Sequence, residues 1–397
     1  MTPAARLQSA ITLLDEIIIA ARNNGASADT LATQFFAARR YAGSKDRRAV
    51  RNLTWAAIRH FGECPANARS AFVALADHDT EMAALFDGTP YGPAHIVAGE
   101  ARADGAVIPA WIQPLFSPLI DAAEQAALLE RAPLDLRVNR LKGDRASVLA
   151  DLPDAQILPQ SEYALRLPTG FAADNHPVIR DGRADIQDLG SQLIVNACAA
   201  KPSMTVVDLC AGAGGKTLAL ASDMDGQGRI IASDTNRRRL GQLIPRAQRA
   251  GARNIETMLL NPGRERAMLN DVVGKCDIVL IDAPCSGTGT WRRNPELRWR
   301  LTPERLDQVI TVQAHIMDIG AAIVRPGGAL VYAVCSLLDK EGAKQVDAFM
   351  TRNTGWAIES LGSETAKVTG RAHGGGTMLT PQHDGTDGFF MARLQKL

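Results

Sequence analysis

The sequence predicts a multidomain protein with an all-α N-terminal domain, then a small α/β module, then an α/β domain with a mostly parallel sheet. Its 397 residues exceed what one hydrophobic core usually serves. Apolar residues recur at helical spacing in the first part, whereas strand-like and helical segments alternate from about residue 183 to the C-terminus. We place the three domains at 1–125, 126–182 and 183–397.

The N-terminal region predicts amphipathic helices. Four apolar residues share one helical stripe that stops before the Asn24-Gly25 turn, namely Leu7, Ile11, Leu14 and Ile18. A further helix is predicted to begin with Ser44 as its N-cap and to end before Gly62.

The stretch that contains this second helix, residues 39–59, is strongly basic and has two aromatic residues, Tyr41 and Trp55, among its charges. Such a pattern suits a surface that binds an RNA backbone. It equally suits a solvated helix face whose aromatic residues belong to the core, and this stretch taken alone favours the second interpretation. The basic residues are Arg39, Arg40, Lys45, Arg47, Arg48, Arg51 and Arg59.

Between about residues 133 and 168 the pattern changes to alternation. Leu134, Leu136 and Val138 alternate with polar residues, and a second strand-like run follows at 163–167. These runs predict the small α/β module, which a loop rich in Gly, Asp and Pro separates from the last domain.

Composition limits the functional class only weakly. The 44 basic and 43 acidic side chains nearly balance, so any affinity for nucleic acid must come from local patches. The six cysteines are sparse and lack C-x-x-C spacing, which favours a reducing cytoplasm over a disulfide scaffold. No signal-peptide pattern or membrane-length apolar run is present, and we expect a cytoplasmic monomer without a metal site.

A candidate cofactor site begins in VVDLCAGAGGKT, residues 206–217, which predicts a strand, a glycine turn and a helix start. Cys210 stands where a Walker A loop needs glycine, and Thr217 stands where G-x-G-x-x-G needs its last glycine. A second strand ends in Asp234, where an acid can accept both hydroxyls of an adenosine ribose. Both features favour S-adenosyl-L-methionine, although either alone could be a tight turn or a helix cap.

Two cysteines follow apolar strand-like runs in this last domain. Cys285 stands in DAPCSGTG after the strand that delivers Asp282, and Cys335 follows a strand fifty residues later. A free cysteine on a strand is usually a small buried hydrophobe, but two at strand ends beside a cofactor site favour chemistry. Carbon 5 of cytosine becomes nucleophilic only after addition to carbon 6, a step that a thiolate performs well. The pair therefore indicates cytosine-5 methylation.

With these motifs the chain resembles the RsmB/Sun-type RNA cytosine-5 methyltransferases over nearly its whole length. The resemblance rests on an ordered set: Gln187-Asp188 with Ser191-Gln192, the glycine loop, DAPCSGTG, RRNPE at 292–296, Cys335-Ser336 and the closing DGFF at 387–390. The first half resembles the bacterial ribosomal RNA branch, which carries a NusB-like helical domain. The resemblance thus implies a Rossmann-like methyltransferase domain, an RNA substrate that is ribosomal, and an RNA-binding role for the basic helix.

The resemblance also implies the roles of individual residues. Cys335 would attack carbon 6, Asp282 would contact ring nitrogen 3, Cys285 would assist release, and Lys216 is a candidate helper that could instead support the loop. The target base must leave its stack, which favours single-stranded or loop RNA. The implied cofactor contacts are Asp208, Cys210, Ala211, Gly212, Ala213, Gly214, Gly215, Lys216, Asp234, Arg239, Asn261, Asp282 and Pro284.

Some positions depart from the family pattern. Ala213 replaces a proline, Val334 a threonine, and Asn261 an aspartate that contacts adenine, while Gly342-Ala343 replaces a polar pair. A tRNA methyltransferase would share the same catalytic core, and a ribosome-assembly factor that kept the fold would explain the departures. The intact Asp282, Cys285 and Cys335 speak against the assembly factor.

A basic segment with two tryptophans follows the Cys285 loop directly. Its pattern suits phosphate contacts and base stacking near the target, so we expect it to help hold the RNA strand. Away from such a site it would be interpreted as a surface segment that caps a helix. Its residues are Trp291, Arg292, Arg293, Arg298, Trp299 and Arg300.

Overall fold

The computed structural model describes residues 1–105, 107–173, 175–362 and 368–397. The chain divides into two compact units. The helical unit contains Met1–Phe116 and Thr290–Pro303, and the sheet unit contains Ser117–Gly289 and Glu304–Leu397. The finer boundaries expected at 125 and 182 stay a prediction. Within the described ranges, no helix combines the length and apolarity needed to cross a membrane.

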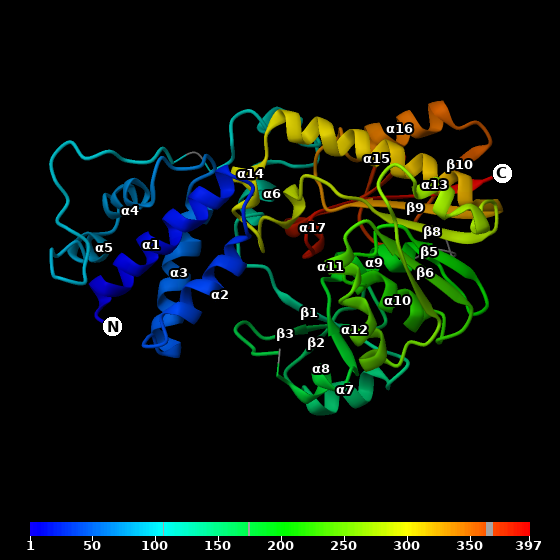
Figure 1. Cartoon of the computed structure of the whole chain (residues 1–397), viewed down its shortest axis with the longest axis horizontal. Coiled ribbons are helices and arrows are strands. Elements are labelled where there is room, and N and C mark those ends of the chain that lie inside the picture. Colours follow the sequence, from blue (N-terminus) through cyan, green and yellow to red (C-terminus); the bar gives the residue numbers. More distant parts are fainter. Residues whose placement is uncertain (106, 174, 363–367) are drawn as a thin grey trace. The chain divides into compact units, whose positions relative to one another are not determined.

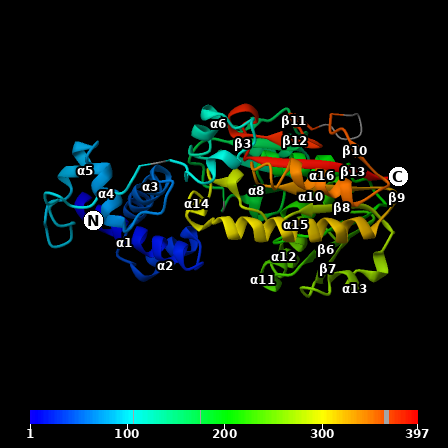
Figure 2. The same ribbon diagram turned by 90° about the horizontal axis from the view of Figure 1, so that it is seen from above.

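The helical unit is built on α1, which buries the predicted stripe completely or nearly so. Four of its helices begin at side-chain caps: Thr2 accepts from the Ala5 amide, Ser27 from Thr30, Asn67 from Ser70, and Asp79 from Glu81 and Met82. The helices lie side by side in Figures 1 and 2. Their bounds are α1 Pro3–Arg22, α2 Ala28–Ala38, α3 Ser44–His60, α4 Ala68–Ala76, α5 Thr80–Ala84, the 3-10 turn η1 Gln113–Leu115, and α14 Leu297–Arg300.

The predicted N-cap of the basic helix is wrong by one residue. Gly43 occupies the N-cap position of α3 and Ser44 is the first helical residue, without a side-chain cap bond. Trp55 is buried and Arg51 lies over its ring at 4.4 Å, whereas Tyr41 is exposed. Of the two aromatic residues, therefore, only Trp55 belongs to the core.

The segment 290–303 packs inside the helical unit, although the sequence places it between two elements of the sheet unit. Its helix α14 lies against α1, and the two appear side by side in both views (Figures 1 and 2). Trp299 is buried in the helical core, and its indole Nε1 donates to the Phe61 carbonyl at 2.8 Å. The Glu296 carboxylate accepts from the Ala28 amide at 3.2 Å.

Arg298 is buried in the same unit. Its Nη2 donates to the Ile58 carbonyl at 2.6 Å and to the Arg59 carbonyl at 3.2 Å, and its Nη1 donates to Val107. The two former carbonyls belong to the last turn of α3, where the helix dipole favours a cation. Burial lowers the pKa of the guanidinium to about 10.

The prediction that this whole segment faces RNA is therefore wrong for its buried members. Trp291, Arg292, Arg298 and Trp299 are buried, and the last two use their polar groups on carbonyls of the helical unit. Arg300 donates to the carbonyls of Gly25 and Ala26 at 2.9 and 2.6 Å. The segment stabilises the helical unit, and RNA contact by Arg293 stays a prediction.

The sheet unit contains a small antiparallel sheet in the order β2-β3-β1-β4. The alternation in β1 is confirmed, but its polar side chains are buried as well as its apolar ones. Asp135 accepts from Arg166 at 2.7 Å, and Arg137 pairs with Asp185 at 3.1 Å, so the charges on this face are satisfied inside the protein. The strands are β1 Leu134–Val138, β2 Gln156–Ile157, β3 Ala164–Leu167 and β4 Ala184–Ile186.

The larger sheet has nine strands among the described residues, in the order β11-β12-β13-β9-β8-β5-β6-β7, with β10 also paired to β13. Five neighbouring strands, in the order β9, β8, β5, β6 and β7, run parallel. Strand β13 pairs with β9 in the antiparallel direction. This confirms the predicted Rossmann-like domain with a mostly parallel sheet. Its strands are β5 Thr205–Asp208, β6 Arg229–Asp234, β7 Ile255–Leu259, β8 Cys276–Asp282, β9 Val324–Val334, β10 Trp356–Glu359, β11 Arg371–His373, β12 Gly376–Leu379 and β13 Phe389–Lys396.

Helices cover both faces of this sheet. α9 and α10 lie along one face and α15 and α16 along the other (Figure 1). The helical segments of the sheet unit are α6 Ala122–Ala127, α7 Arg145–Asp151, α8 Pro177–Arg180, α9 Leu189–Cys198, α10 Gly215–Asp223, α11 Arg237–Leu240, α12 Leu243–Ala250, α13 Glu265–Met268, η2 Asn270–Val272, η3 Thr288–Thr290, α15 Pro303–Ile323, α16 Ala343–Arg352 and α17 Pro381–Asp384. The last residue of η3 and the first of α15 fall in the helical unit.

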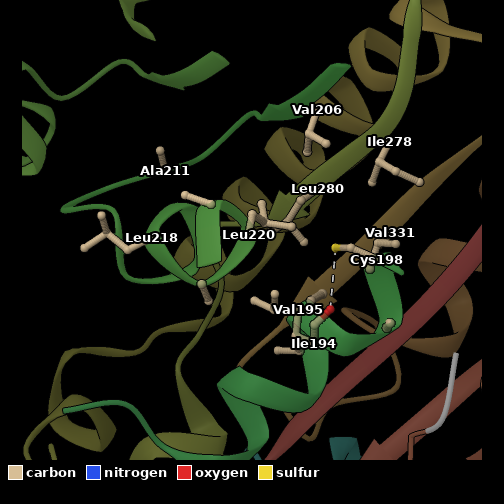
Figure 3. Close-up of a cluster of buried hydrophobic side chains, with 14 of the residues drawn as sticks. Ile194, Val195, Cys198, Val206, Ala211, Leu218, Leu220, Ile278, Leu280 and Val331 are labelled. Carbon is tan, nitrogen blue, oxygen red and sulfur yellow. Dashed lines mark hydrogen bonds between the residues drawn. The ribbon is translucent and has the colours of Figure 1, made fainter. Parts of the chain in front are cut away.

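The core of the sheet unit lies between α9, α10 and the parallel strands. Figure 3 shows Cys198 at the end of α9 among apolar side chains such as Val195 and Val331, with its thiol donating to the Ile194 carbonyl. Burial raises the pKa of this thiol. Cys198 therefore behaves as a small hydrophobic residue, as a free cysteine in a hydrophobic core usually does.

We expect Trp299→Ala to lower the free energy of unfolding of the helical unit by about 3–5 kcal/mol, because it removes a large buried ring and its hydrogen bond. Trp299→Phe keeps most of the buried area, and its loss should be about 1–2 kcal/mol. Urea unfolding followed by circular dichroism measures both. Tyr41→Ala, at an exposed aromatic residue of the same unit, is the control and should stay within about 0.5 kcal/mol.

Candidate active site

The predicted glycine loop connects β5 to α10 at the carboxyl edge of the sheet. The Leu209 amide donates to the Leu280 carbonyl and the Ala211 amide to the Ser233 carbonyl, both at 2.9 Å, so the loop is fixed to β8 and β6. Gly214 is the N-cap of α10 with φ +83°, and a Cβ there would lie 2.0 Å from Leu243 Cδ1. Only glycine fits this position, because a side chain would meet both strain and a clash.

Asp234 ends the neighbouring strand β6. Its two carboxylate oxygens accept from the amides of Gly212 and Asn236, each at 2.7 Å. These bonds hold the glycine loop against β6 and make Asp234 more than a helix cap. Because each carboxylate oxygen has a further lone pair, Asp234 can still accept hydroxyl groups from a ligand.

Asp208, at the end of β5, is buried. Its Oδ2 accepts from Thr217 Oγ1 at 2.7 Å, and its Oδ1 has no hydrogen-bond partner among the described residues. Burial raises the pKa of this carboxyl to about 7, against the opposing hydrogen bond from Thr217. A buried carboxylate oxygen without a donor, beside a glycine loop, suits a ligand that brings a donor group.

The remaining predicted cofactor residues lie around this loop with different exposure. Arg239 is exposed and its Nη2 lies beside Gly212, at 2.5 Å from where a Cβ would stand. Arg246, which the sequence did not indicate, donates to the Ala213 carbonyl at 2.8 Å. Burial raises the pKa of the Cys210 thiol. Asn261 is exposed, two residues after the end of β7.

The structure brings the two predicted cysteines together. β8 and β9 are parallel with Asp282 opposite Ala333, so Cys285 and Cys335 leave the sheet at the same edge. Their sulfur atoms lie 3.3 Å apart. The hydrogen bond with Cys335 and burial raise the pKa of Cys285 well above its usual value, which favours the protonated form of Cys285.

Lys216 and Asp282 form the charged part of this edge. Lys216 Nζ lies 2.7 Å from Asp282 Oδ2 and 5.7 Å from the ring centre of Phe389, a residue of the closing DGFF motif. Burial alone would lower the pKa of Lys216, but the charge and hydrogen bond of Asp282, together with other acidic groups nearby, outweigh it and the net shift is upward. Lys216 therefore stays protonated beside the carboxylate and the thiols.

Backbone hydrogen bonds of two glycines, Gly289 and Gly388, fix the end of the loop that carries Cys285. The Gly388 amide donates to the Gly289 carbonyl at 2.8 Å, and the Gly289 amide donates to the Cys335 carbonyl at 3.0 Å. A Cβ on Gly289 would lie 1.9 Å from the Gly388 carbonyl oxygen. The close approach of the two chains explains why both motifs need glycine here.

Four residues beside the thiols had no role predicted from the sequence, namely Glu341, Ser286, Ser336 and Gln313. All four are buried. A signal existed, because a serine directly follows each of the two cysteines. Among the described residues, no group of three or more His, Cys, Asp or Glu side chains is placed to hold a metal ion.

A glycine loop after one parallel strand and an acidic residue after the next define an α/β fold of the S-adenosylmethionine-dependent methyltransferase class. The family model described as 16S rRNA methyltransferase RsmB/F matches residues 195–395, and the chain belongs to this family. S-adenosyl-L-methionine is the cofactor of this family, and the donors and acceptors around the loop fit it.

Among curated proteins, the chain is similar to the probable ribosomal RNA small subunit methyltransferase B of Synechocystis. The two are 34% identical over 309 residues, which cover 72% of this chain. The chain spans 66% of that relative's length, just under two thirds.

Solved structures share the fold. PH0851 aligns with a TM-score of 0.80 and 20% identity over 100% of this chain and 99% of its own. NSun6 from Pyrococcus horikoshii, solved with SFG, aligns with a TM-score of 0.63 and 19% identity over 72% of this chain and 96% of its own. These similarities show that the chain shares the fold of both proteins.

The raised pKa of Asp208 predicts a pH-dependent stability. Its folded pKa of about 7 lies above the ordinary value near 3.8, so its contribution to stability is full below pH 4 and is lost as the pH rises through 7. We expect the free energy of unfolding of Asp208→Asn, relative to that of the wild type, to be higher at pH 8 than at pH 5. Urea unfolding at both pH values measures this difference.

Asp277→Asn is the control for that comparison. Asp277 accepts from the Thr205 amide at 2.8 Å at the opposite end of β5 and is half-exposed rather than deeply buried. Its difference from the wild type should be the same at pH 5 and pH 8. An unchanged difference for Asp208→Asn would mean that the Asp208 carboxyl titrates normally in the folded protein.

Proposed function

We propose that this protein transfers a methyl group from S-adenosyl-L-methionine to carbon 5 of a cytosine in small-subunit ribosomal RNA. The observation that carries the proposal is the thiol pair, Cys285 and Cys335, with 3.3 Å between its sulfurs at the edge that holds the glycine loop. Family membership supports the methyl donor and an RNA substrate. Two thiols at one edge support carbon rather than amino-nitrogen methylation.

The cofactor, when bound, supplies the electrophilic methyl group. Asp234 would accept the two ribose hydroxyls, since its carboxylate already contacts the loop. The loop from Cys210 to Gly215 would let the ligand approach the backbone, and the exposed residues Arg239, Asn261 and Pro284 would add contacts to it. The unpartnered Asp208 oxygen is available to a donor group of the ligand.

The reaction would begin at Cys335. Its thiolate forms a bond to carbon 6 of the cytosine, and the electron pair of the 5,6 double bond becomes available at carbon 5 for the methyl group. Asp282 would hold ring nitrogen 3, and the ammonium of Lys216, 2.7 Å from Asp282, would stabilise negative charge nearby.

Release requires the proton on carbon 5 to leave and the bond between Cys335 and carbon 6 to break. We assign assistance in this step to Cys285, because its sulfur already contacts that of Cys335. The Cys285 thiol would give its proton to the departing Cys335 sulfur, and the Cys285 thiolate that results would take the proton from carbon 5. The products are 5-methylcytosine and the Cys335 thiol, which loses its proton again before the next attack. The two thiols thus have different tasks.

RNA binding by the helical unit is the remaining part of the proposal. Arg40, Lys45 and Arg48 are exposed near the start of α3, and the exposed Tyr41 lies in the same stretch. Lysine and arginine side chains there would bind phosphates, and the tyrosine ring would accept a stacked base. A transfer RNA could use the same surface, and the choice of RNA in the assay separates the two substrates.

We expect Cys335→Ala to lower methyl transfer at least about 1000-fold, since loss of a nucleophile removes the covalent route. Cys285→Ala should instead accumulate a covalent RNA–protein adduct. Both are measured with labelled S-adenosyl-L-methionine and unmodified small-subunit ribosomal RNA, by nucleoside analysis and denaturing gels. Methylation of purified tRNA in place of ribosomal RNA would decide for the tRNA enzyme.

Cys276→Ala is the matched control for the two thiol variants. Cys276 is buried at the start of β8, with its thiol directed to the Val272 carbonyl, so the same substitution there should leave transfer near the wild-type rate. New 5-methylcytosine made by Cys335→Ala would overturn the assignment of the nucleophile. No transfer by the wild type to either RNA, with the cofactor bound, would favour an assembly factor.

Asp234→Asn should weaken binding of S-adenosyl-L-methionine about tenfold to a hundredfold, because hydrogen bonds to a charged acceptor contribute about 1.5–3 kcal/mol. Isothermal titration calorimetry measures the dissociation constant. Glu256→Gln, at the exposed carboxylate that pairs with Arg229, is the control and should bind as the wild type does. Equal affinity of Asp234→Asn and wild type would remove Asp234 from the cofactor site.

A further inference from the structure

Glu341 is completely buried close to the two thiols, in the loop between β9 and α16. Its Oε1 accepts from the Ser286 amide at 2.8 Å and from Gln313 Nε2 at 2.9 Å. Its Oε2 accepts from Ser336 Oγ at 2.5 Å and from Ser286 Oγ. Four donors from three elements therefore converge on one carboxylate.

This network is the kind of arrangement that a buried carboxylate requires. An ionised group in the interior costs several kcal/mol unless donors replace its water. Here the amide of Ser286, two serine hydroxyls and the amide group of Gln313 replace it. Such a satisfied network fixes the position of the groups that build it.

The groups that build the network flank both cysteines. Ser286 follows Cys285 and Ser336 follows Cys335 in the sequence. Gln313 Nε2 also donates to the carbonyl of Pro284, the residue before Cys285, at 2.9 Å. Both neighbours of Cys285 are therefore fixed to Glu341, one directly and the other through Gln313.

The two cysteines depend on this network to different extents. Cys335 directly follows the strand β9, whose pairing with β8 and β13 fixes it. Cys285 lies in a loop, three residues after the end of β8. Loss of Glu341 should therefore displace Cys285 more than Cys335.

We propose that Glu341 is a positioning residue that holds Cys285 against Cys335 and so governs the release step of the reaction. The inference rests on the proposed function for its chemistry. Its geometric part, the contact between the two sulfurs, holds for any substrate. The two parts are tested separately.

The donors on the two oxygens differ in a way that a substitution can use. The backbone N–H of Ser286 and the Nε2 of Gln313, which bind Oε1, can only donate, whereas the serine hydroxyls on Oε2 can also accept. In Glu341→Gln, the amide oxygen can take the Oε1 place and the NH₂ group can donate to the hydroxyls. Glu341→Gln should keep the geometry, and Glu341→Ala should lose it.

The geometric test measures how fast the two thiols form a disulfide with diamide, which takes up their two hydrogens and becomes a hydrazine. Wild type and Glu341→Gln should form the Cys285–Cys335 disulfide at rates within about threefold of each other, and Glu341→Ala about tenfold or more slowly. Peptide mapping identifies the bond. Equal rates in all three proteins would overturn the proposal, whatever RNA the enzyme uses.

The chemical test measures methyl transfer and RNA–protein adduct in the same variants. Glu341→Ala should lower turnover about tenfold to a hundredfold and accumulate the adduct, while Glu341→Gln restores turnover to within about threefold of wild type. The affinity for S-adenosyl-L-methionine should not change. If the wild type makes no 5-methylcytosine, the proposed function is wrong. The rates of disulfide formation then decide by themselves whether Glu341 positions Cys285.

Glu124→Ala is the matched control. Glu124 is equally a buried carboxylate of the sheet unit, with bonds to Arg371 at 2.8 Å, Thr380 Oγ1 at 2.6 Å and the Gln382 amide at 3.0 Å. The Glu124→Ala variant should be less stable than the wild type but should not accumulate the RNA–protein adduct. If Glu341→Ala does not fold, Glu341→Asp withdraws the carboxylate by one methylene and takes its place. Adduct accumulation in Glu124→Ala as well would show that general destabilisation, and not Glu341, explains the effect.

Discussion

The parallel pairing of β8 with β9 is the constraint on which the candidate active site depends. With Asp282 opposite Ala333, both strands end at one edge, and the thiols that follow them meet at 3.3 Å. The pairing of β5 with β8 brings Asp208 beside Leu280 and places the glycine loop at the same edge. Hydrogen bonds between strands, rather than any contact with ligand, thus determine which side chains can act together.

Much of this arrangement could be predicted because parallel strands deliver their C-terminal residues to one place. Asp234, Asp282, Cys285 and Cys335 were predicted from strand ends alone, and the stripe of α1 from its helical period. The partner of a residue was harder to predict. Glu341 lies in a loop, and its role follows from three-dimensional contacts with Ser286 and Gln313 that no periodicity reveals.

Burial of polar side chains explains why β1 is not a solvated strand and why the RNA-binding prediction for segment 290–303 was wrong in part. In β1, Asp135 and Arg137 alternate with apolar residues as on a solvated strand, yet ion pairs with Arg166 and Asp185 allow both faces to be buried. Arg298 and Trp299 are residue types typical of an RNA-binding segment. Their N–H groups, however, donate hydrogen bonds to carbonyls at the end of α3 and at Phe61. A charged side chain in a sequence needs polar partners, and those partners can be groups of the same protein rather than RNA.

The charges around the thiols also act in a consistent direction. Glu341 lies on the side of Cys285, where its negative charge adds to the rise in the pKa of that thiol. The Lys216 ammonium interacts favourably with negative charge on Cys335, which adds to the rise in the pKa of Lys216. The two thiols therefore differ in their charged neighbours, because Glu341 lies near Cys285 and Lys216 lies near Cys335. Two chemically identical side chains have unlike surroundings in this fold, and separate roles in attack and release require such a difference.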